Sequence, residues 1–123
     1  MSFEFKNDTP IYLQIFEHVK RMIITGEYAP TQKLPSVREF SATFRVNPNT
    51  VQKALLELEN EKLIYTDRTS GKFVTNDKTV LENVKNDAIR KLTVNFLNEA
   101  KLLKISREEV LNIIENEDIL WKF

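Results

Sequence analysis

Cysteine is absent from this 123-residue sequence, and histidine and glycine are scarce. The lack of cysteine excludes disulfide bonds and thiolate metal sites. A single histidine, His18, cannot form a His-rich zinc site, and two glycines are too few for a Gly-rich phosphate-binding loop. Catalysis needs a base or a nucleophile in a pocket, and of the usual candidates cysteine is absent and histidine occurs once. The sequence therefore argues against an enzyme and implies no metal and no cofactor.

Long hydrophobic runs are also missing, so no segment is expected to span a membrane. The N-terminal stretch "MSFEFKNDTP" is acidic and polar and has no signal-peptide pattern. Hydrophobic residues make up 41% of the chain, which is enough for a core. We expect a cytoplasmic protein with one domain, or with a small domain and an appendage.

Net charge is zero, because 18 basic residues balance 18 acidic residues. Residues 1–76 carry a charge of +1 and residues 77–123 a charge of −1. DNA-binding domains are usually basic, so the overall balance weighs against a nucleic-acid partner. Any DNA-binding surface must be local, with the acidic residues on other faces.

A first helix is predicted in "DTPIYLQIFEHVKRMIITGEY". Thr9 is expected to cap its start, Pro10 to occupy its first position, and Gly26 to end it in a left-handed conformation. Apolar residues recur at helical spacing and predict one buried stripe. The stripe consists of Ile11, Ile15, Val19 and Ile23.

Two short helices are predicted next, separated by a tight turn. Ser36 and Glu39 have the spacing of a capping box at the start of "SVREFSATF". Asn47 and Pro48 are typical of the cap and first position of the following helix. Only the residues "RV" separate the two helices, which predicts a helix-turn-helix whose second helix would enter the major groove of DNA. The expected buried stripe of that helix consists of Val51, Ala54, Leu55 and Leu58.

A β-hairpin is predicted in "LIYTDRTSGKFVTN", where apolar and polar residues alternate on both sides of the turn. Gly71 supplies the positive φ that the turn needs. A hairpin directly after a helix-turn-helix predicts a winged helix. The acidic run at residues 57–62, just before the hairpin, is expected to be a solvated helix face with Glu–Lys support.

Helical periodicity returns after residue 79. One long helix is predicted from about residue 80 to about residue 103, followed by a short helix that Ser106 and Glu109 cap. This tail is too small to bury its apolar stripe alone, and we expect the stripe to form a homodimer seam. The predicted seam residues are Leu81, Val84, Ala88, Leu92 and Phe96. The expected fold is mainly α with a small β-hairpin, as a winged helix-turn-helix at residues 1–76 and a two-helix dimerisation tail at residues 77–123.

Three stretches, "KLPSVREF", "VNPNTVQKAL" and "GKFV", occur in an order and spacing that resemble the GntR family of bacterial transcription factors. The "D-x-P-I-Y-x-Q-I" opening and the short helical tail are most similar to its YtrA-like subfamily. The resemblance implies a dimeric regulator, usually a repressor, that binds a palindromic operator. It also implies DNA contacts at Arg38, Asn47, Asn49, Thr50, Gln52, Lys53 and Gly71.

The chemistry of these side chains supports the same assignment. Asn49 and Gln52 can each form two hydrogen bonds with adenine, and Thr50 can bind a phosphate oxygen. Arg38 and Lys53 are candidate anchors for phosphates or bases. The wing lacks the arginine that is common in the family before the glycine, so Arg68 or Lys72 is expected to replace it. The alternatives are a capping role for Asn49 and Thr50, and solvated surface positions for the basic residues.

The sequence shows no effector site. A small-molecule effector, if one exists, is expected in the tail or at the dimer seam, where Phe96, Trp121 and Phe123 could line a cavity. The alternative for these aromatics is ordinary core or interface packing. A winged helix that binds only another protein is the alternative function, although the polar residues Asn49, Gln52 and Lys53 do not favour it.

Overall fold

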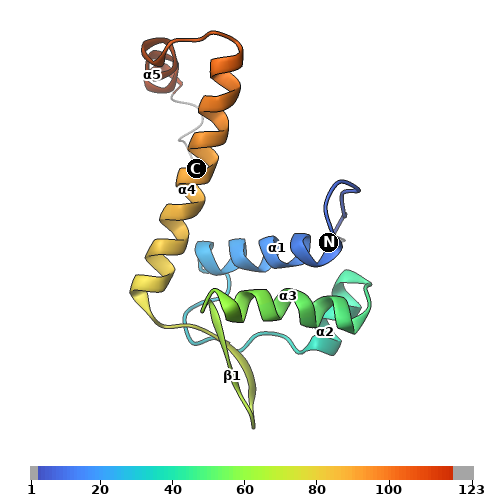
Figure 1. Cartoon of the computed structure of the whole chain (residues 1–123). Coiled ribbons are helices and arrows are strands. Elements are labelled where there is room, and N and C mark those ends of the chain that lie inside the picture. The colour runs from blue at the N-terminus through green and yellow to red at the C-terminus, as the bar shows by residue number, and fades with distance from the viewer. Residues whose placement is uncertain (1–2, 118–123) are drawn as a thin grey trace. The chain divides into compact units, whose positions relative to one another are not determined.

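The computed structural model describes residues 3–117, and these residues form two compact units that divide after Lys85. We call these the winged unit and the tail unit and treat each by itself. Within the described residues, helices predominate over a single two-stranded hairpin (Figure 1). The elements are α1 (Ile11–Thr25), α2 (Val37–Phe44), α3 (Pro48–Asn60), β1 (Ile64–Asp67), β2 (Gly71–Val74), α4 (Lys78–Leu102) and α5 (Arg107–Asn116). The predicted fold class is confirmed.

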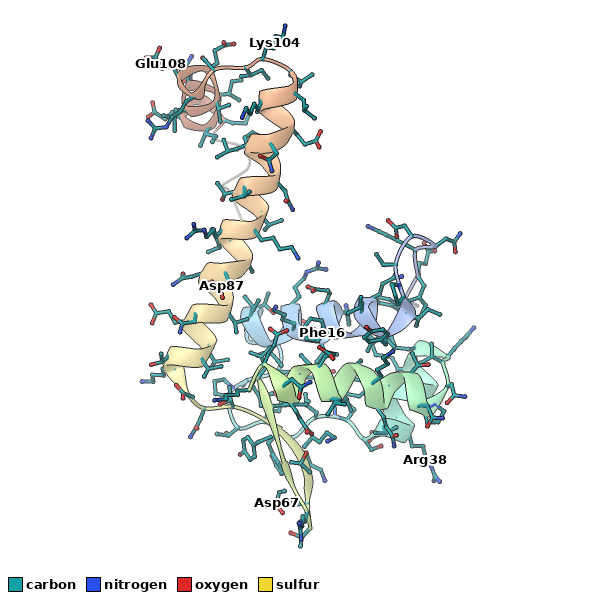
Figure 2. The ribbon with its side chains drawn as sticks, in the orientation of Figure 1. Phe16, Arg38, Asp67, Asp87, Lys104 and Glu108 are labelled. Atoms are coloured by element: carbon teal, nitrogen blue, oxygen red, sulfur yellow. The ribbon has the colours of Figure 1, made fainter. Side chains whose placement is uncertain are left out.

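The core of the winged unit forms where α1, α2 and α3 pack together with the base of the hairpin. All four stripe residues predicted for α3 are buried, and Phe16 of α1 lies in the same cluster (Figure 2). No polar or charged side chain is buried among residues 3–117. Burying one such apolar side chain stabilises a fold by about 1.5–3 kcal/mol, so this cluster accounts for the packing of the three helices.

The helix ends follow the predicted caps, with one correction at α1. The Ser36 hydroxyl accepts from the Glu39 N–H and the Glu39 carboxylate accepts from the Ser36 N–H, which completes the capping box of α2. Gly26 ends α1 at a φ of 83°. Pro10, and not Thr9, is the N-cap of α1, and no side-chain oxygen caps that helix.

The hairpin pairs β1 with β2 in antiparallel register, from Ile64 opposite Val74 to Asp67 opposite Gly71. The other edge of β2 is also paired, because the Leu34 N–H donates to the Lys72 carbonyl at 2.8 Å and the Val74 N–H donates to the Gln32 carbonyl at 2.9 Å. An isolated antiparallel bridge between Lys33 and Phe73 thus joins the segment between Pro30 and Pro35 to β2. This pairing anchors the base of the wing to the loop before α2.

The first two turns of α4 belong to the winged unit. Val80, Leu81 and Val84 are partly buried and pack against its core. The division between the compact units falls after Lys85, whereas the sequence pattern placed it after residue 76. The predicted limits of the long helix, about 80 and about 103, lie within two residues of the observed ones.

In the tail unit, a short turn joins the rest of α4 to α5. Lys104 has a φ of 59°, and the Ile105 N–H donates to the Ala100 carbonyl at 3.1 Å. Ala100 and Val110 are the buried residues of this pair. The predicted capping box of Ser106 and Glu109 is present at the start of α5.

Candidate nucleic-acid interface

The N-terminal turns of α3 separate a buried side from an exposed polar side. The Asn47 Oδ1 atom accepts from the Asn49 N–H at 2.8 Å, so Asn47 acts first as the helix cap. The side chains of Asn49 and Gln52 are exposed, and Thr50 is half-buried. Because Val51 and Ala54 face the core, the exposed amides are available to base edges without any loss of packing.

The turn between α2 and α3 is fixed by local hydrogen bonds. Arg45 has a left-handed φ of 56°, and the Val46 N–H donates to the Ser41 carbonyl at 3.2 Å. The Ser41 hydroxyl donates back to the Val46 carbonyl. These bonds hold the two helices at a set angle, as a helix-turn-helix requires.

Arg38 lies in the first turn of α2, with its side chain exposed and directed away from the helices (Figure 2). The nearby Glu39 carboxylate accepts hydrogen bonds from Ser36, and these bonds lower the pKa of Glu39. Glu39 is therefore committed to the cap, and Arg38 projects its charge into solvent at the start of the helix-turn-helix.

Lys53 is less free than its exposed position suggests. Its Nζ atom lies 4.1 Å from the centre of the Tyr12 ring on α1. A cation over an aromatic ring is stabilised by about 0.5–1 kcal/mol at an exposed site. Lys53 thus rests against α1 in the free protein, and a DNA contact would require it to leave the ring.

The wing tip is organised by Asp67. Its carboxylate accepts from the Thr69 N–H at 2.9 Å and from the Thr69 hydroxyl at 2.8 Å, and these bonds lower the pKa of Asp67. Figure 2 shows Asp67 at the end of the hairpin. Gly71 has a φ of 115°, and a Cβ atom there would lie 3.0 Å from the Lys33 Cε. Arg68 is exposed within the ordered turn.

Lys72, the other candidate wing cation, already has an anionic partner. Its Nζ atom donates to the Glu59 carboxylate of α3 and, at 2.8 Å, to the Thr66 hydroxyl. The hydrogen bond from Lys72 is the main cause of a lowered pKa of Glu59. The acidic run was predicted to be a solvated face with Glu–Lys support. Glu61 fits this prediction, because it is exposed and its carboxylate forms an ion pair with Lys20 at 3.1 Å, whereas Glu59 is half-buried against the wing.

The five predicted seam residues fall into two groups. Leu81 and Val84 contact the core of the winged unit and are only partly exposed. In the tail unit Ala88 is half-buried, whereas Leu92 and Phe96 are 71% and 52% exposed. The helical period of the sequence revealed the apolar face of α4. It did not reveal that the first turns of α4 pack on the core of the winged unit.

Phe96 also lines an apolar hollow of about 380 Å³ in the tail unit, together with residues of α4 and α5. Trp121 and Phe123, the other aromatics considered for an effector site, lie outside the described residues. Between residues 3 and 117, no helix is both long and apolar enough to cross a bilayer. The same part of the chain holds no cluster of acidic or histidine side chains suited to a metal ion.

A protein-family model described as "Bacterial regulatory proteins, gntR family" matches residues 11–74. The chain is 33% identical to the uncharacterized HTH-type transcriptional regulator YhcF of Bacillus subtilis, over 94% of this chain and 95% of YhcF. It is 37% identical to the HTH-type transcriptional repressor YtrA of Bacillus subtilis, over 85% of this chain and 82% of YtrA.

Solved structures agree with these sequence matches. A GntR family transcriptional regulator from Listeria monocytogenes superposes with a TM-score of 0.85 at 40% identity, covering 90% of this chain and 97% of that chain. The AraR DNA-binding domain in complex with operator ORX1 superposes with a TM-score of 0.56 at 29% identity, covering 61% of this chain and 99% of that chain.

Proposed function

The chain belongs to the gntR family of bacterial regulatory proteins, and we propose that it represses transcription by binding a palindromic DNA operator as a homodimer. Its relatives are transcriptional regulators and not enzymes, in agreement with the prediction of a non-catalytic protein. The observation that carries the proposal is the exposed polar side of α3, where Asn49 and Gln52 stand opposite the buried stripe.

Related proteins support both the DNA partner and the direction of regulation. YtrA and NagR of Bacillus subtilis are named as transcriptional repressors, and the AraR domain was solved with operator DNA. We assign base contacts to Asn49 and Gln52, and phosphate contacts to Thr50, Arg38 and the N-terminus of α3. We propose secondary DNA contacts for Lys53, Asn47 and Gly71, the other positions that the family resemblance implies.

The homodimer is proposed from the exposed apolar side chains of the tail unit. Leu92 and Phe96 are joined by Ile89, Val94 and Leu97 as large exposed apolar residues of α4. Exposed apolar surface of this density marks an interaction site. A two-fold dimer presents two identical recognition helices, and such a pair fits a palindromic site.

A small-molecule effector, if one regulates the protein, is proposed to enter the hollow beside Phe96. Because Phe96 belongs to the proposed seam as well, a ligand there would act on dimerisation. We place the protein in the cytoplasm, where a bacterial repressor meets its operator.

The experiment that tests the proposal is a gel shift and footprint on the promoter of the protein's own operon across a salt series. We expect a two-fold symmetric footprint, and affinity should fall steeply with salt because phosphate contacts release counterions. If no specific shift appears even at low salt, random-sequence selection is the next step. Failure there, together with salt-independent binding of a protein, would favour the protein-contact module instead.

The same assay tests the Arg38 assignment. Replacing Arg38 with Ala should weaken operator binding by more than about tenfold, since a hydrogen bond to a charged group such as a phosphate contributes about 1.5–3 kcal/mol. Arg21→Ala on the exposed side of α1 is the matched control and should bind as the unmodified protein does. Equal affinity of the Arg38→Ala variant, with its helical circular dichroism unchanged, would refute the assignment.

A further inference from the structure

A contact between α3 and the wing removes one basic residue from the set that can bind DNA. The Glu59 carboxylate receives hydrogen bonds from the Lys72 Nζ and from the Thr66 hydroxyl. The side chains of Glu59 and Lys72 are each 28% exposed, so water screens the pair only partly. The two charges therefore neutralise each other beside the recognition helix.

The register of the hairpin explains why these side chains meet. Thr66 and Lys72 are direct cross-strand partners. They share a face of the hairpin with Ile64 and Val74, which are buried in the core, because alternate residues of a strand point to the same side. Glu59 follows the buried Leu58 on α3. The pair thus lies at the rim of the core, where the wing leaves the helices.

The backbone of Lys72 is fixed as well. Its carbonyl accepts from the Leu34 N–H at 2.8 Å, on the edge of β2 away from β1. Both ends of the residue are therefore held in the free protein. The exposed Arg68 at the wing tip differs, because no ion pair of its side chain occurs within the described residues.

A DNA phosphate would have to compete with Glu59 for Lys72. The exchange would replace one ion pair by another and would leave an unpaired carboxylate close to a polyanion, so it offers little gain. We propose that Glu59 withholds Lys72 from DNA, so that Arg68 is the wing cation that contacts a phosphate. Glu59 is then a positioning residue, and this inference rests on the proposed function.

Four variants measured on a duplex spanning the footprint test the inference through the salt dependence of binding. Each phosphate contact contributes about 0.9 to the slope of log affinity against log salt. Arg68→Met should make the slope shallower by about 0.9, whereas Lys72→Met should leave it unchanged. Glu59→Gln frees Lys72 and should steepen the slope by about 0.9 and strengthen binding.

The matched control is Glu57→Gln. It removes the same charge from the same helix, and the described residues show no ion pair or side-chain hydrogen bond at Glu57. It should leave the slope unchanged. A slope for Lys72→Met as shallow as that for Arg68→Met would overturn the inference, and so would identical slopes for Glu59→Gln and Glu57→Gln.

A DNA-free measurement separates this inference from the proposed function. Acetylation of the free protein with an N-hydroxysuccinimide ester, followed by mass spectrometry, should modify Lys72 several-fold more slowly than the exposed Lys62. Glu59→Gln should speed the modification of Lys72, although its hydrogen bond to Thr66 remains, and Glu57→Gln should leave the rate unchanged. Normal DNA binding with a rapidly modified Lys72 overturns only this inference. If Lys72 is modified slowly but the protein does not bind DNA, the proposed function is overturned. The proposed role of Glu59 in DNA binding is then overturned as well.

Discussion

Lys62 ends α3 in a conformation that suits glycine better than lysine. Its φ is 63°. The Lys62 N–H donates to the Glu59 carbonyl at 2.9 Å and the Leu63 N–H donates to the Leu58 carbonyl at 3.0 Å, which is the hydrogen-bond pattern of a Schellman motif. Leu58 and Leu63 are both buried, so the motif leads the chain from α3 into the hairpin.

Lys62→Gly should therefore stabilise the protein by about 1 kcal/mol, because the left-handed conformation strains a residue with a Cβ atom. Chemical denaturation monitored by circular dichroism would measure the change. Lys62→Ala is the control, since it removes the charge and keeps the Cβ atom, and it should give almost no gain. Equal gains for the two variants would show that charge, and not backbone strain, determines stability here.

The protonation of His18 should make the free energy of unfolding depend on pH. Its ring lies edge-on to Phe3 and Phe44, with ring centres 4.8 Å and 5.8 Å away. Burial lowers the pKa of His18 below its ordinary value of 6.5, the Arg21 charge lowers it further, and Glu27 opposes the shift. The unfolded chain therefore binds a proton on His18 more readily than the folded chain does.

Above the pKa that His18 has in the unfolded chain, His18 should not change the free energy of unfolding with pH. As the pH drops through and below 6.5, the free energy of unfolding should fall. His18→Phe keeps an aromatic ring but cannot titrate, so its stability should not decline in this window. Urea denaturation at closely spaced pH values would compare the two slopes. Parallel curves for both proteins would mean that His18 makes no contribution to the pH dependence.

At the scale of single elements, the clearest sequence signals were those that act within a few residues. The capping boxes at Ser36 and Ser106 and the cap at Asn47 are present where the sequence placed them. Each depends on side chains and backbone amides less than one turn apart. The prediction of Thr9 as the N-cap of α1 was wrong by one residue. The local sequence does not show whether the helix begins at Pro10 or directly after it.

Ser36→Ala tests how much one of these caps contributes. Loss of an N-cap costs about 1 kcal/mol, which corresponds to a fall in melting temperature of about 4–8 °C for a domain of this size. Amide hydrogen exchange should show faster opening of α2. Ser106→Ala is the matched variant in the tail unit and should accelerate exchange in α5 while leaving α2 unaffected. Faster exchange of both helices in either variant would show that the two units unfold together.

Contacts between distant elements could not be read from the sequence. The Glu59–Lys72 pair joins α3 to β2, and the stack of Lys53 on Tyr12 joins α3 to α1. Each depends on the packing of separate elements, whereas periodicity shows only which face of an element is apolar. The bridge between Lys33 and Phe73 was hidden for a related reason, because two flanking prolines mark a loop and do not reveal its partner.

For the whole molecule, the central question is how the apolar surface of the tail unit is covered. Leu92 is the test position, because it is 71% exposed and belongs to the proposed seam. Leu92→Asp places a charge in that seam and should yield monomers in light scattering. The folded monomer should tolerate the change, since an exposed side chain makes few contacts to lose.

Asn98→Asp is the control for this prediction. It adds the same charge to α4 at another exposed position, on a different side of the helix. The control should remain dimeric. Persistence of the dimer in Leu92→Asp would place the interface elsewhere, and dissociation of both variants would indicate a general effect of charge on the tail.

The two sides of α3 have a consequence for how such regulators diverge. The buried side is entirely apolar, and the exposed Asn49 and Gln52 make none of its contacts. Substitutions at exposed positions usually change stability by no more than about 0.5 kcal/mol. A duplicated copy could therefore acquire a new operator through a few surface changes while its core drifted separately among apolar residues. Selection can act on DNA recognition in this fold almost independently of selection for folding.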